Sequence, residues 1–375
     1  MASLYLHIPF CKTKCCYCSF NSFAAMGEMY NPYVKALKME ISQLVEKSER
    51  TPLETLFIGG GTPTVLAPDQ LVDIIRHVET LFGFTRDAEI SIEANPGTVG
   101  DADLIKLKNG GVNRLSLGVQ SFDDMELRIL GRCHTSSDAE KAIRLAQERG
   151  IENISIDLMY GLPGQDAESW RWSLDMAFSL NLKHLSIYQL TIEPGTVMEG
   201  SINRGELFLP GEDDIAEMDE LTIRFIRESR LNQYEISNYA EDGSECRHNI
   251  NYWQNNTYLA AGAGSVSFIG GVREKRVSDP SNYINLITVG ENVIQDSEQL
   301  SAEGSFRESV VMGLRMNRGV SVSDLSSRYS IDLREYYGDI LTRLIGLSLV
   351  TLRGDRLQMT DAGRQFANGI MSELV

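Results

Sequence analysis

Long apolar segments are missing from this chain of 375 residues. An uncharged stretch from Tyr258 to Val272 is interrupted by glycine and serine, and it is shorter than the ~20 apolar residues that cross a bilayer. The N-terminal MASLYLHIPF has neither the basic start nor the apolar core of a signal peptide. We therefore expect a cytoplasmic protein without stable membrane insertion.

Basic residues are also scarce, since 35 Lys and Arg face 52 Asp and Glu and leave a net charge of −17. Such a field repels phosphate backbones and anionic lipids. Residues 301–375 read as helices around a hairpin-like VTLRGDRLQM, which resembles a winged helix, but they contain nine Arg and nine acidic residues. Because the basic excess of a nucleic-acid reader is absent, we expect a structural or partner-docking domain and no nucleic-acid partner.

Cysteines are few outside one short segment. Four of the six lie between Cys11 and Cys18, while Cys133 and Cys246 are isolated. In a large chain without an export signal, this clustering indicates a metal or redox site in a reducing compartment more than disulfides. Zinc is less suitable, because it takes four ligands and no matching second CxxC follows.

The chain does contain a repeated alternation of strand-like apolar runs and segments of helical period. The expected strands are Leu4–Ile8, Thr55–Ile58, Glu89–Ile92, Arg114–Val119, Ile154–Leu158 and His184–Leu190. The expected helices are Pro32–Glu46, Pro68–Leu81, Ala102–Asn109, Ser137–Gln147, Ala167–Leu180 and Asp213–Leu231. Six such units imply an α/β fold with a parallel sheet, either a curved partial barrel or a flat doubly wound sheet.

The position of the polar residues favours the barrel. The cysteines, Gly59–Thr62, Glu93, Gln120 and Asp157 all follow the carboxyl end of an expected strand. In α/β folds of either kind this edge of the sheet faces the ligand.

The cysteine segment contains the spacing C-x3-C-x2-C, formed by Cys11, Cys15 and Cys18 directly after the first strand. Three thiolates can hold three irons of a [4Fe–4S] cluster and leave the fourth open to a chelating ligand. Only Cys15 preserves this spacing, so we expect the adjacent Cys16 to be a bystander.

The words YLHIPFCKTKCCYC, FIGGGTPT, SIEANP, GVQSF and IDLMYGLP resemble those of the radical S-adenosylmethionine (SAM) superfamily, and within it the coproporphyrinogen dehydrogenase and heme chaperone (HemW-like) group. The resemblance runs over nearly the whole chain. It implies SAM bound at the open iron, where a reduced cluster can cleave it to methionine and a 5′-deoxyadenosyl radical. With the repeat pattern it indicates a partial (β/α)6 barrel over 1–240, an irregular connection over 241–298 and a helical, winged-helix-like domain over 299–375.

Matched to the family's motifs, nine positions are implied as SAM contacts. They are Tyr5, Tyr17, Gly60, Gly61, Thr62, Glu93, Gln120, Arg132 and Asp157. Backbone at the glycines can approach the methionyl end closely, the acidic and amide groups can accept hydrogen bonds, and the arginine can pair with a carboxylate. A plain tight turn and simple helix caps are the alternative readings of these residues.

The word HNINYW begins with His248, whose imidazole is a natural axial iron ligand beside two aromatic residues. It resembles the heme-binding signature of the heme chaperones, and Cys246 is a second candidate ligand. The alternative is a surface turn that Tyr252 and Trp253 anchor to the core.

Three functions are therefore compared. The first is a heme chaperone, with heme as cargo, heme-acceptor proteins as partners, and an electron donor such as a flavodoxin or ferredoxin if SAM is cleaved. The second is the oxygen-independent coproporphyrinogen III dehydrogenase, which has a further cysteine where this chain has Phe20, and an N-terminal extension for which this chain has no room. The third, a cluster-bearing DNA- or partner-binding regulator, is disfavoured by the charge balance. We expect the chaperone.

Overall fold

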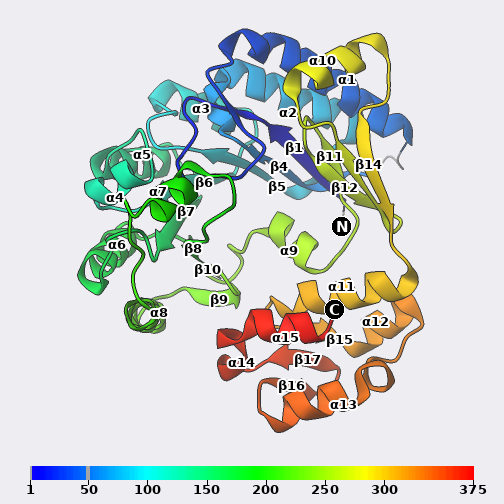
Figure 1. Cartoon of the computed structure of the whole chain (residues 1–375). Helices are drawn as coiled ribbons and strands as arrows, with labels where there is room; N and C mark the ends of the chain where they lie inside the picture. Colours follow the sequence, from blue (N-terminus) through cyan, green and yellow to red (C-terminus); the bar gives the residue numbers. More distant parts are fainter. Residues whose placement is uncertain (1, 48–50) are drawn as a thin grey trace.

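A sheet with six parallel central strands organises the larger part of the chain (Figure 1). The computed structural model describes residues 2–47 and 51–375. The six strands are β1 (Ser3–Ile8), β4 (Leu53–Gly60), β5 (Phe84–Ala94), β6 (Arg114–Gln120), β7 (Asn153–Tyr160) and β8 (His184–Gln189). They lie side by side in chain order, and each expected strand overlaps one of them. The predicted α/β class with a parallel sheet is confirmed.

Both edges of this sheet carry strands that the sequence pattern did not predict. β11 (Leu259–Ala261) pairs in parallel with β1, and β10 (Asn238–Ala240) and β9 (Asn232–Glu235) continue the sheet beyond β8 in antiparallel fashion. These strands are too short to show a period of two. The sheet of nine strands remains open, because β11 and β9 end it without pairing to each other.

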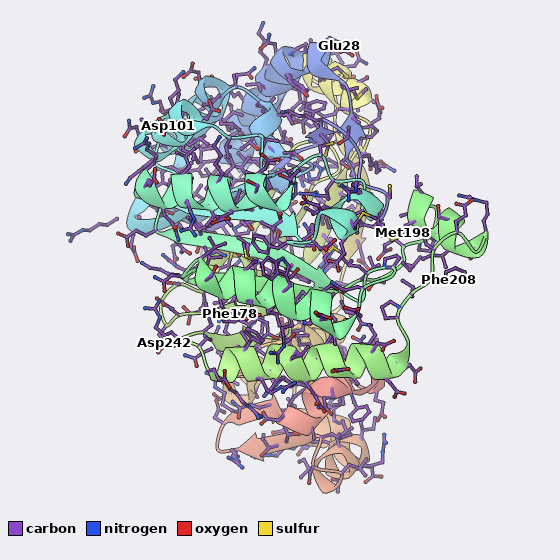
Figure 2. The ribbon with its side chains drawn as sticks, turned by 90° about the vertical axis from the view of Figure 1, so that its left-hand side faces the viewer. Glu28, Asp101, Phe178, Met198, Phe208 and Asp242 are labelled. Atoms are coloured by element: carbon purple, nitrogen blue, oxygen red, sulfur yellow. The ribbon has the colours of Figure 1, made fainter. Side chains whose placement is uncertain are left out.

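Helices cover the outside of the curved sheet (Figures 1 and 2). They are α1 (Tyr30–Lys47), α2 (Pro68–Phe82), α3 (Asp101–Asn109), α4 (Asp124–Ile129), α5 (Ser136–Glu148), α6 (Ala167–Ser179) and α8 (Glu212–Arg227). A further helix, α7 (Val197–Asn203), projects at one side of the barrel (Figure 2). Side-chain caps begin several of them; Asp166, for example, accepts a hydrogen bond from the backbone N–H of Ser169. Helix α8 ends four residues before the expected Leu231, because Ser229 turns the chain toward β9.

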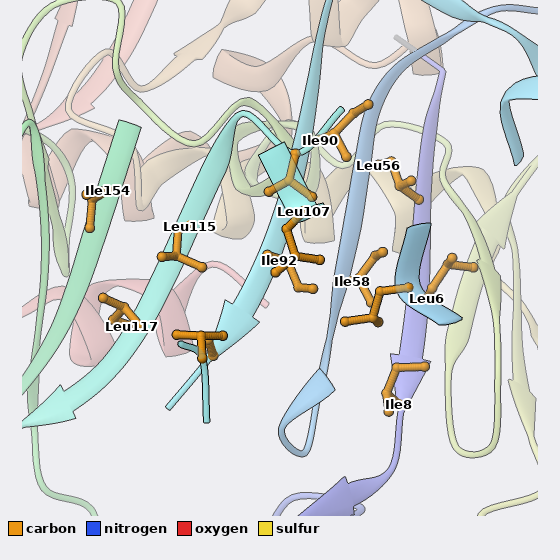
Figure 3. Packing of buried hydrophobic residues seen from close by; sticks show 14 of the residues in the cluster. Leu6, Ile8, Leu56, Ile58, Ile90, Ile92, Leu107, Leu115, Leu117 and Ile154 are labelled. Carbon is orange, nitrogen blue, oxygen red and sulfur yellow. The ribbon is translucent and has the colours of Figure 1, made fainter. Parts of the chain in front are cut away.

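The two faces of each strand differ in chemistry, and this difference creates the site. Alternate residues such as Leu6, Ile58 and Ile92 are apolar, fully buried and packed in the main hydrophobic core (Figure 3). The residues between them line the concave side and are mostly polar, among them Tyr5 and Glu93, with Phe57 as an apolar exception. Since strand side chains alternate between faces, one sequence pattern supplies both a core and a polar interior.

The stretch 241–298, expected to be irregular, contains regular elements. They are α9 (Arg247–Trp253), β11, β12 (Val266–Ile269), β13 (Val272–Arg276), α10 (Pro280–Val289) and β14 (Ile294–Gln299). The strands β12, β13 and β14 form an antiparallel sheet. A buried ion pair joins the Arg276 guanidinium to the Glu40 carboxylate of α1 at 2.9 Å, so this sheet is fixed to the barrel. Glycine-rich, short strands conceal such order from periodicity.

The C-terminal segment has its own hydrophobic core around Phe306 and Leu333. It contains α11 (Ala302–Leu314), β15 (Val320–Ser321), α12 (Val322–Tyr329), α13 (Leu333–Gly346), β16 (Val350–Arg353), β17 (Arg356–Met359), α14 (Asp361–Gln365) and α15 (Ala367–Glu373). Helix α9 lies between this segment and the barrel (Figure 1). Across residues 2–47 and 51–375, no helix is both long and apolar enough to cross a membrane.

Candidate cluster and cofactor site

The three expected cluster ligands lie on one loop at the carboxyl end of β1. The loop leaves through β2 (Phe10–Cys11), which pairs in parallel with β3 (Phe23–Ala24) where the chain returns. The Asn21 amide holds the returning strand by donating to the carbonyls of Ala263 and Ser278 at 3.0 and 3.1 Å. The cysteine loop is therefore supported by the connecting segment, far along the chain.

Each of the three sulfurs has a polar neighbour. The hydroxyl of Thr62 lies 3.5 Å from the Cys11 sulfur, and a guanidinium nitrogen of Arg132 lies 3.4 Å from the Cys15 sulfur. Ser22 lies 3.9 Å from the third sulfur, that of Cys18. Hydrogen bonds to ligand sulfurs orient the ligands and tune the potential of a cluster.

Cys16 is held in a different way. Its backbone N–H donates to the carbonyl of Leu130 at 3.0 Å, and its carbonyl accepts from Met198 of α7 at 2.9 Å. The side chain packs with an apolar cluster around Leu162, beside Gly131. Figure 2 shows the segment with Met198 and Phe208 projecting at one side of the barrel. Cys16 thus anchors the loop to neighbouring elements, as a bystander would.

Among the residues that the structure describes, no three Cys, His, Asp or Glu side chains converge as the ligands of one ion would. In a [4Fe–4S] cluster each thiolate binds a different iron, so the three cysteines need not converge on one ion.

The glycine turn after β4 leaves no room for side chains. A Cβ at Gly60, whose φ is +117°, would lie 2.6 Å from the imidazole of His7. A Cβ at Gly61 would lie 2.6 Å from the carbonyl oxygen of Phe10 and 3.0 Å from the Cys11 sulfur. Only glycine permits this close approach of backbone to the cluster loop.

Asn95 connects two of the expected residues and was missed as a site residue. Its amide nitrogen donates to the Thr62 hydroxyl at 2.9 Å, and its carbonyl oxygen accepts from Arg132 at 2.6 Å. These partners are the same groups that contact the sulfurs of Cys11 and Cys15. The signal was present in the word SIEANP, where Asn95 follows a strand end two residues after Glu93.

Two carboxyl groups, on the strands β5 and β7 that flank β6, have raised pKa values. Burial raises the pKa of Glu93 to about 7, although the hydrogen bond from the Gly60 N–H opposes the shift. Burial likewise raises the pKa of Asp157 to about 6, against the hydrogen bond of Ser186 and the charges of Arg114 and Arg132. A cationic ligand would favour the charged forms, so both groups are suited to receive one.

The remaining expected SAM residues lie around this region. Gln120 ends β6 with a φ of +73°, an unusual conformation for a residue other than glycine and one that clusters at functional sites. The Tyr5 hydroxyl is hydrogen-bonded to His7 at 2.9 Å. Burial raises the pKa of Tyr17 above its usual value, and its ring packs beside Cys16 in the same apolar cluster. These groups border the glycine turn and the cysteine loop.

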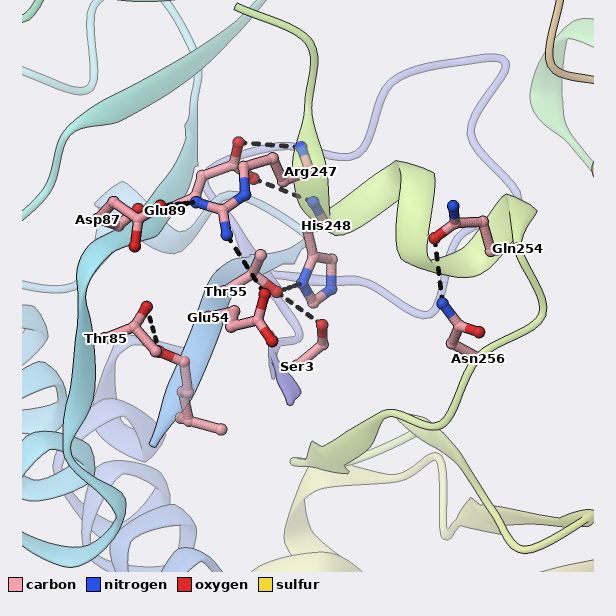
Figure 4. A network of polar contacts seen from close by, with 11 residues as sticks. Ser3, Glu54, Thr55, Thr85, Asp87, Glu89, Arg247, His248, Gln254 and Asn256 are labelled. Carbon is pink, nitrogen blue, oxygen red and sulfur yellow. Dashed lines mark hydrogen bonds and ion pairs between the residues drawn. The ribbon is translucent and has the colours of Figure 1, made fainter. Parts of the chain in front are cut away.

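His248 is fully buried at the amino ends of the strands, opposite the cysteine loop. Its Nδ1 lies 2.8 Å from the Thr55 hydroxyl (Figure 4). Its Nε2 lies 2.9 Å from the Tyr252 hydroxyl. Since Thr55 donates to Ser3, Nδ1 carries the proton and Nε2 accepts from Tyr252. Burial lowers the pKa of His248 to about 3, so the ring is neutral.

Glu89 of β5 holds the start of helix α9 against the barrel. Its carboxylate accepts from the backbone N–H groups of Arg247 and His248 at 3.0 and 3.1 Å (Figure 4). The Cys246 thiol also points to it at 3.7 Å, and burial raises the pKa of that thiol to about 12. The word HNINYW is therefore an ordered helix that closes the barrel floor, not a surface turn.

One cavity of about 310 Å³ lies between the buried carboxyl groups of Glu93 and Asp157 and the helix α9. It is lined by Tyr5, Phe57, Glu93, Arg114, Ser116, Asp157, Ser186, Tyr188, Cys246, His248, Asn249 and Tyr252. Three expected SAM residues and the residues of the HNINYW helix thus share a single polar chamber. Arg114 is buried there, and its Nε has no hydrogen-bond partner among the described residues.

Comparisons with known proteins agree with this architecture. Residues 5–177 match the radical SAM superfamily and residues 300–366 match the HemN C-terminal domain. The structure resembles that of the Escherichia coli coproporphyrinogen III oxidase HemN, a radical SAM enzyme, with a TM-score of 0.87 and 25% identity, covering 100% of this chain and 89% of that one. Fold and site together define a radical SAM protein.

Relatives matched over most or nearly all of their length identify the family. The heme chaperone HemW of Bacillus subtilis is 36% identical over 371 residues, which is 99% of this chain and 98% of that protein. The heme chaperone HemW of Escherichia coli is 40% identical over 70% of this chain and 69% of its own length. The mitochondrial radical S-adenosyl methionine domain-containing protein 1 of Mus musculus is 35% identical over 85% and 74%. The chain belongs to the heme chaperone HemW family.

The family inferred from the sequence words is thus confirmed. Membership in the radical SAM superfamily implies a [4Fe–4S] cluster and SAM as the cofactors of the class. The roles of individual residues, including His248 as a heme ligand, stay predictions, as do the domain boundaries at 240 and 298.

Proposed function

We propose that this protein is a heme chaperone that holds a [4Fe–4S] cluster and SAM at the mouth of its barrel, binds heme and delivers it to acceptor proteins. The observation that carries the proposal is the similarity over 99% of the chain to the Bacillus subtilis protein named heme chaperone HemW. The chamber that the HNINYW helix shares with the SAM-side carboxyl groups supports it.

When bound, the cluster and SAM would supply one-electron chemistry, and the chain's own groups would position them. Cys11, Cys15 and Cys18 would ligate three irons, with Thr62 and Arg132 donating hydrogen bonds to two of the sulfurs. The Gly60–Gly61 backbone, Glu93, Gln120 and Asp157 would receive SAM between them, bordered by Tyr5 and Tyr17.

For heme, we propose His248 as an iron ligand, with Cys246 beside it as the second candidate. The protonation state of the ring supports Nε2 as the ligating atom, since it carries no proton. Ligation would first require the Tyr252 hydroxyl to leave this nitrogen. Helix α9 would have to move from the barrel floor, because His248 has no exposed surface in the arrangement described.

The structural similarity to HemN makes coproporphyrinogen III dehydrogenation the second candidate. The residue Phe20 disfavours dehydrogenase activity, because the dehydrogenase group has a further cysteine at this position. The Phe20 side chain is 69% exposed beside the cluster loop. The deciding experiment reconstitutes the cluster anaerobically and adds hemin or coproporphyrinogen III with excess SAM and reductant. We expect hemin to bind and coproporphyrinogen III to persist. Several turnovers to protoporphyrinogen IX would establish the dehydrogenase instead.

The cellular setting follows from the same proposal. The chaperone would act in the cytoplasm, receive electrons from a flavodoxin or ferredoxin if SAM is cleaved, and transfer heme to acceptor proteins. Pull-down of reduced flavodoxin or ferredoxin with the cluster-loaded protein, compared with the Cys11→Ala variant, tests the electron-donor part.

A further inference from the structure

A second cavity of about 420 Å³ lies between helix α9 and the C-terminal segment. Its lining includes Trp253 of α9 and, from the C-terminal segment, Arg318, Asp324, Arg328 and Arg356. Its volume is within the range of about 300–1,000 Å³ that small-molecule sites occupy. No residue of the expected cluster or SAM sites contributes to it.

The charge of this cavity is opposite to that of the chain. Three arginines line it, and Asp324 is the one acidic residue among them. The whole chain has a net charge of −17, so a local excess of positive charge is a departure from the surrounding field. An anion repelled by most of this surface would find its attractive region here.

Two of the arginines face the cavity without partners. Arg328 donates to the carbonyls of Gln254 and Asn255 at 3.0 and 2.7 Å. By contrast, the side chains of Arg318 and Arg356 are largely exposed, and their guanidinium groups make no hydrogen bond or ion pair with any described residue. Partial burial lowers the pKa of Arg318 and the like charge of Arg356 lowers it further, against the opposite charge of Glu245. An anion bound between two like charges reduces their repulsion.

The backbone fixes where the two arginines stand. Gly319 has a φ of +60°, and a Cβ there would overlap the carbonyl oxygen of Leu357. The pairing of β15 with β17 sets Val320 opposite Leu357 and Ser321 opposite Arg356. Because the two strands are antiparallel, Arg318 lies toward the carboxyl end of β17, whereas Arg356 begins that strand. Both side chains line the same cavity.

Trp253 gives the cavity a flat apolar wall with one unused donor. The Arg315 guanidinium stacks over its ring at 4.4 Å, which fixes the indole. The indole Nε1 is buried and has no hydrogen-bond partner among the described residues. Trp253 is the last residue of α9, whereas His248 near the start of that helix faces the barrel chamber. The HNINYW helix therefore presents its aromatic residues to two different cavities.

We infer that this cavity binds the carboxylate edge of heme, with the two propionates on Arg318 and Arg356 and the macrocycle against Trp253. The inference rests on the proposed function, from which the cargo is taken. A guanidinium group can donate two parallel hydrogen bonds to one carboxylate, and the face of an indole ring can stack on a planar macrocycle. The site does not involve the iron, so it would hold the cargo whichever residue ligates the metal.

The test uses iron-free protoporphyrin IX, which retains the propionates but offers no metal. Binding to the full chain is measured by fluorescence for the wild type, Arg318→Met, Arg356→Met and the double variant. We expect about tenfold weaker binding for each single variant and about a hundredfold for the double variant. Arg353→Met is the matched control, because it removes the same charge from the same hairpin but from outside the cavity, and it should bind like the wild type.

Three further binding comparisons distinguish the possible outcomes. Protoporphyrin IX dimethyl ester should bind the wild type as weakly as the acid binds the double variant, a comparison that needs no mutation. Inorganic phosphate at equal concentration should not displace the porphyrin; displacement would assign the cavity to small anions and overturn the heme assignment. Equal affinity of the wild type and the double variant for both hemin and protoporphyrin IX would overturn this inference alone, while a wild type that binds no hemin would overturn the proposed function as well.

Discussion

The two cavities of this chain are built from opposite chemistries although one helix contributes to both. The barrel chamber has Glu93 and Asp157, whose raised pKa values favour a cationic ligand. The cavity at the C-terminal segment has Arg318 and Arg356, which favour an anionic one. Helix α9 gives His248 to the first and Trp253 to the second. The comparison teaches that a single short helix can contact two cavities whose charged residues favour ligands of opposite sign.

The largest expected effect is loss of the cluster from the cysteine loop without any change in porphyrin binding at the second cavity. Cys11→Ala, Cys15→Ala and Cys18→Ala should each abolish the reconstituted cluster, because each removes the thiolate of one iron. Binding of protoporphyrin IX should stay near the wild-type value in all three. Iron and sulfide content and the visible absorbance measure the first result. Cys16→Ala is the control, and loss of iron in that variant equal to the loss in the others would show that the ligand set is wrong.

Gly60→Val should weaken SAM binding by about a hundredfold while iron content stays near normal. The added side chain would meet the His7 imidazole in a backbone conformation that side chains rarely adopt. Isothermal titration of the cluster-loaded protein with SAM gives the affinity. Gly27→Val is the matched control, since a Cβ there meets nothing within 4 Å. Unchanged SAM affinity in Gly60→Val would remove the glycine turn from the site.

The next largest effect should be a difference between the two cavities in how their ligand affinity depends on pH. The Glu93 pKa is about 7, and SAM favours the carboxylate form, so the affinity for SAM should rise with pH and level off above pH 7. One pH unit below the pKa, the affinity should be about tenfold lower than on the plateau. Glu93→Gln should remove most of this slope. Arginines stay charged throughout, so binding of protoporphyrin IX should not strengthen with pH. An affinity for SAM that falls as pH rises would contradict the assignment.

The smallest effect concerns the ligation of heme iron. Tyr252→Phe frees Nε2 of His248, so hemin should bind about threefold more tightly, with a shifted Soret band. Iron-free protoporphyrin IX should not respond. His248→Ala should also shift the Soret band but weaken hemin binding. The control is Tyr258→Phe, which removes a hydroxyl from the ring that packs on Tyr252. An unshifted spectrum in His248→Ala would move the iron ligand to Cys246 or elsewhere.

Much of the barrel was predictable from the sequence. Strands such as β6 and β7 alternate apolar and polar residues, and each expected strand overlaps an observed one. The cysteine spacing and the glycine turn are short local motifs that follow the carboxyl ends of β1 and β4. Because these two strands are parallel neighbours, the two motifs must lie close together. Asn95 was within the quoted word SIEANP, yet its role depends on hydrogen bonds to residues 33 and 37 positions away.

The second cavity had no local signal. Arg318 and Arg356 are far apart in the sequence, and their place in one cavity depends on the pairing of β15 with β17 and on a turn at Gly319 that no periodicity reveals. The burial of His248 was equally hidden, because its partner Thr55 lies 193 positions away. Contacts of this kind arise from tertiary pairing, which a single sequence does not encode in any one segment.

The anchoring of Asn21 has a consequence for the timing of maturation. A chain still being synthesised, with residues up to about 240 emerged, would already carry all three cluster cysteines. It would lack the carbonyls of Ala263 and Ser278 that receive the Asn21 amide, and it would lack Arg276, whose absence leaves the buried Glu40 unpaired. The hydrogen bonds of Asn21 and the ion pair of Glu40 can therefore form only after the chain has been made as far as Ser278.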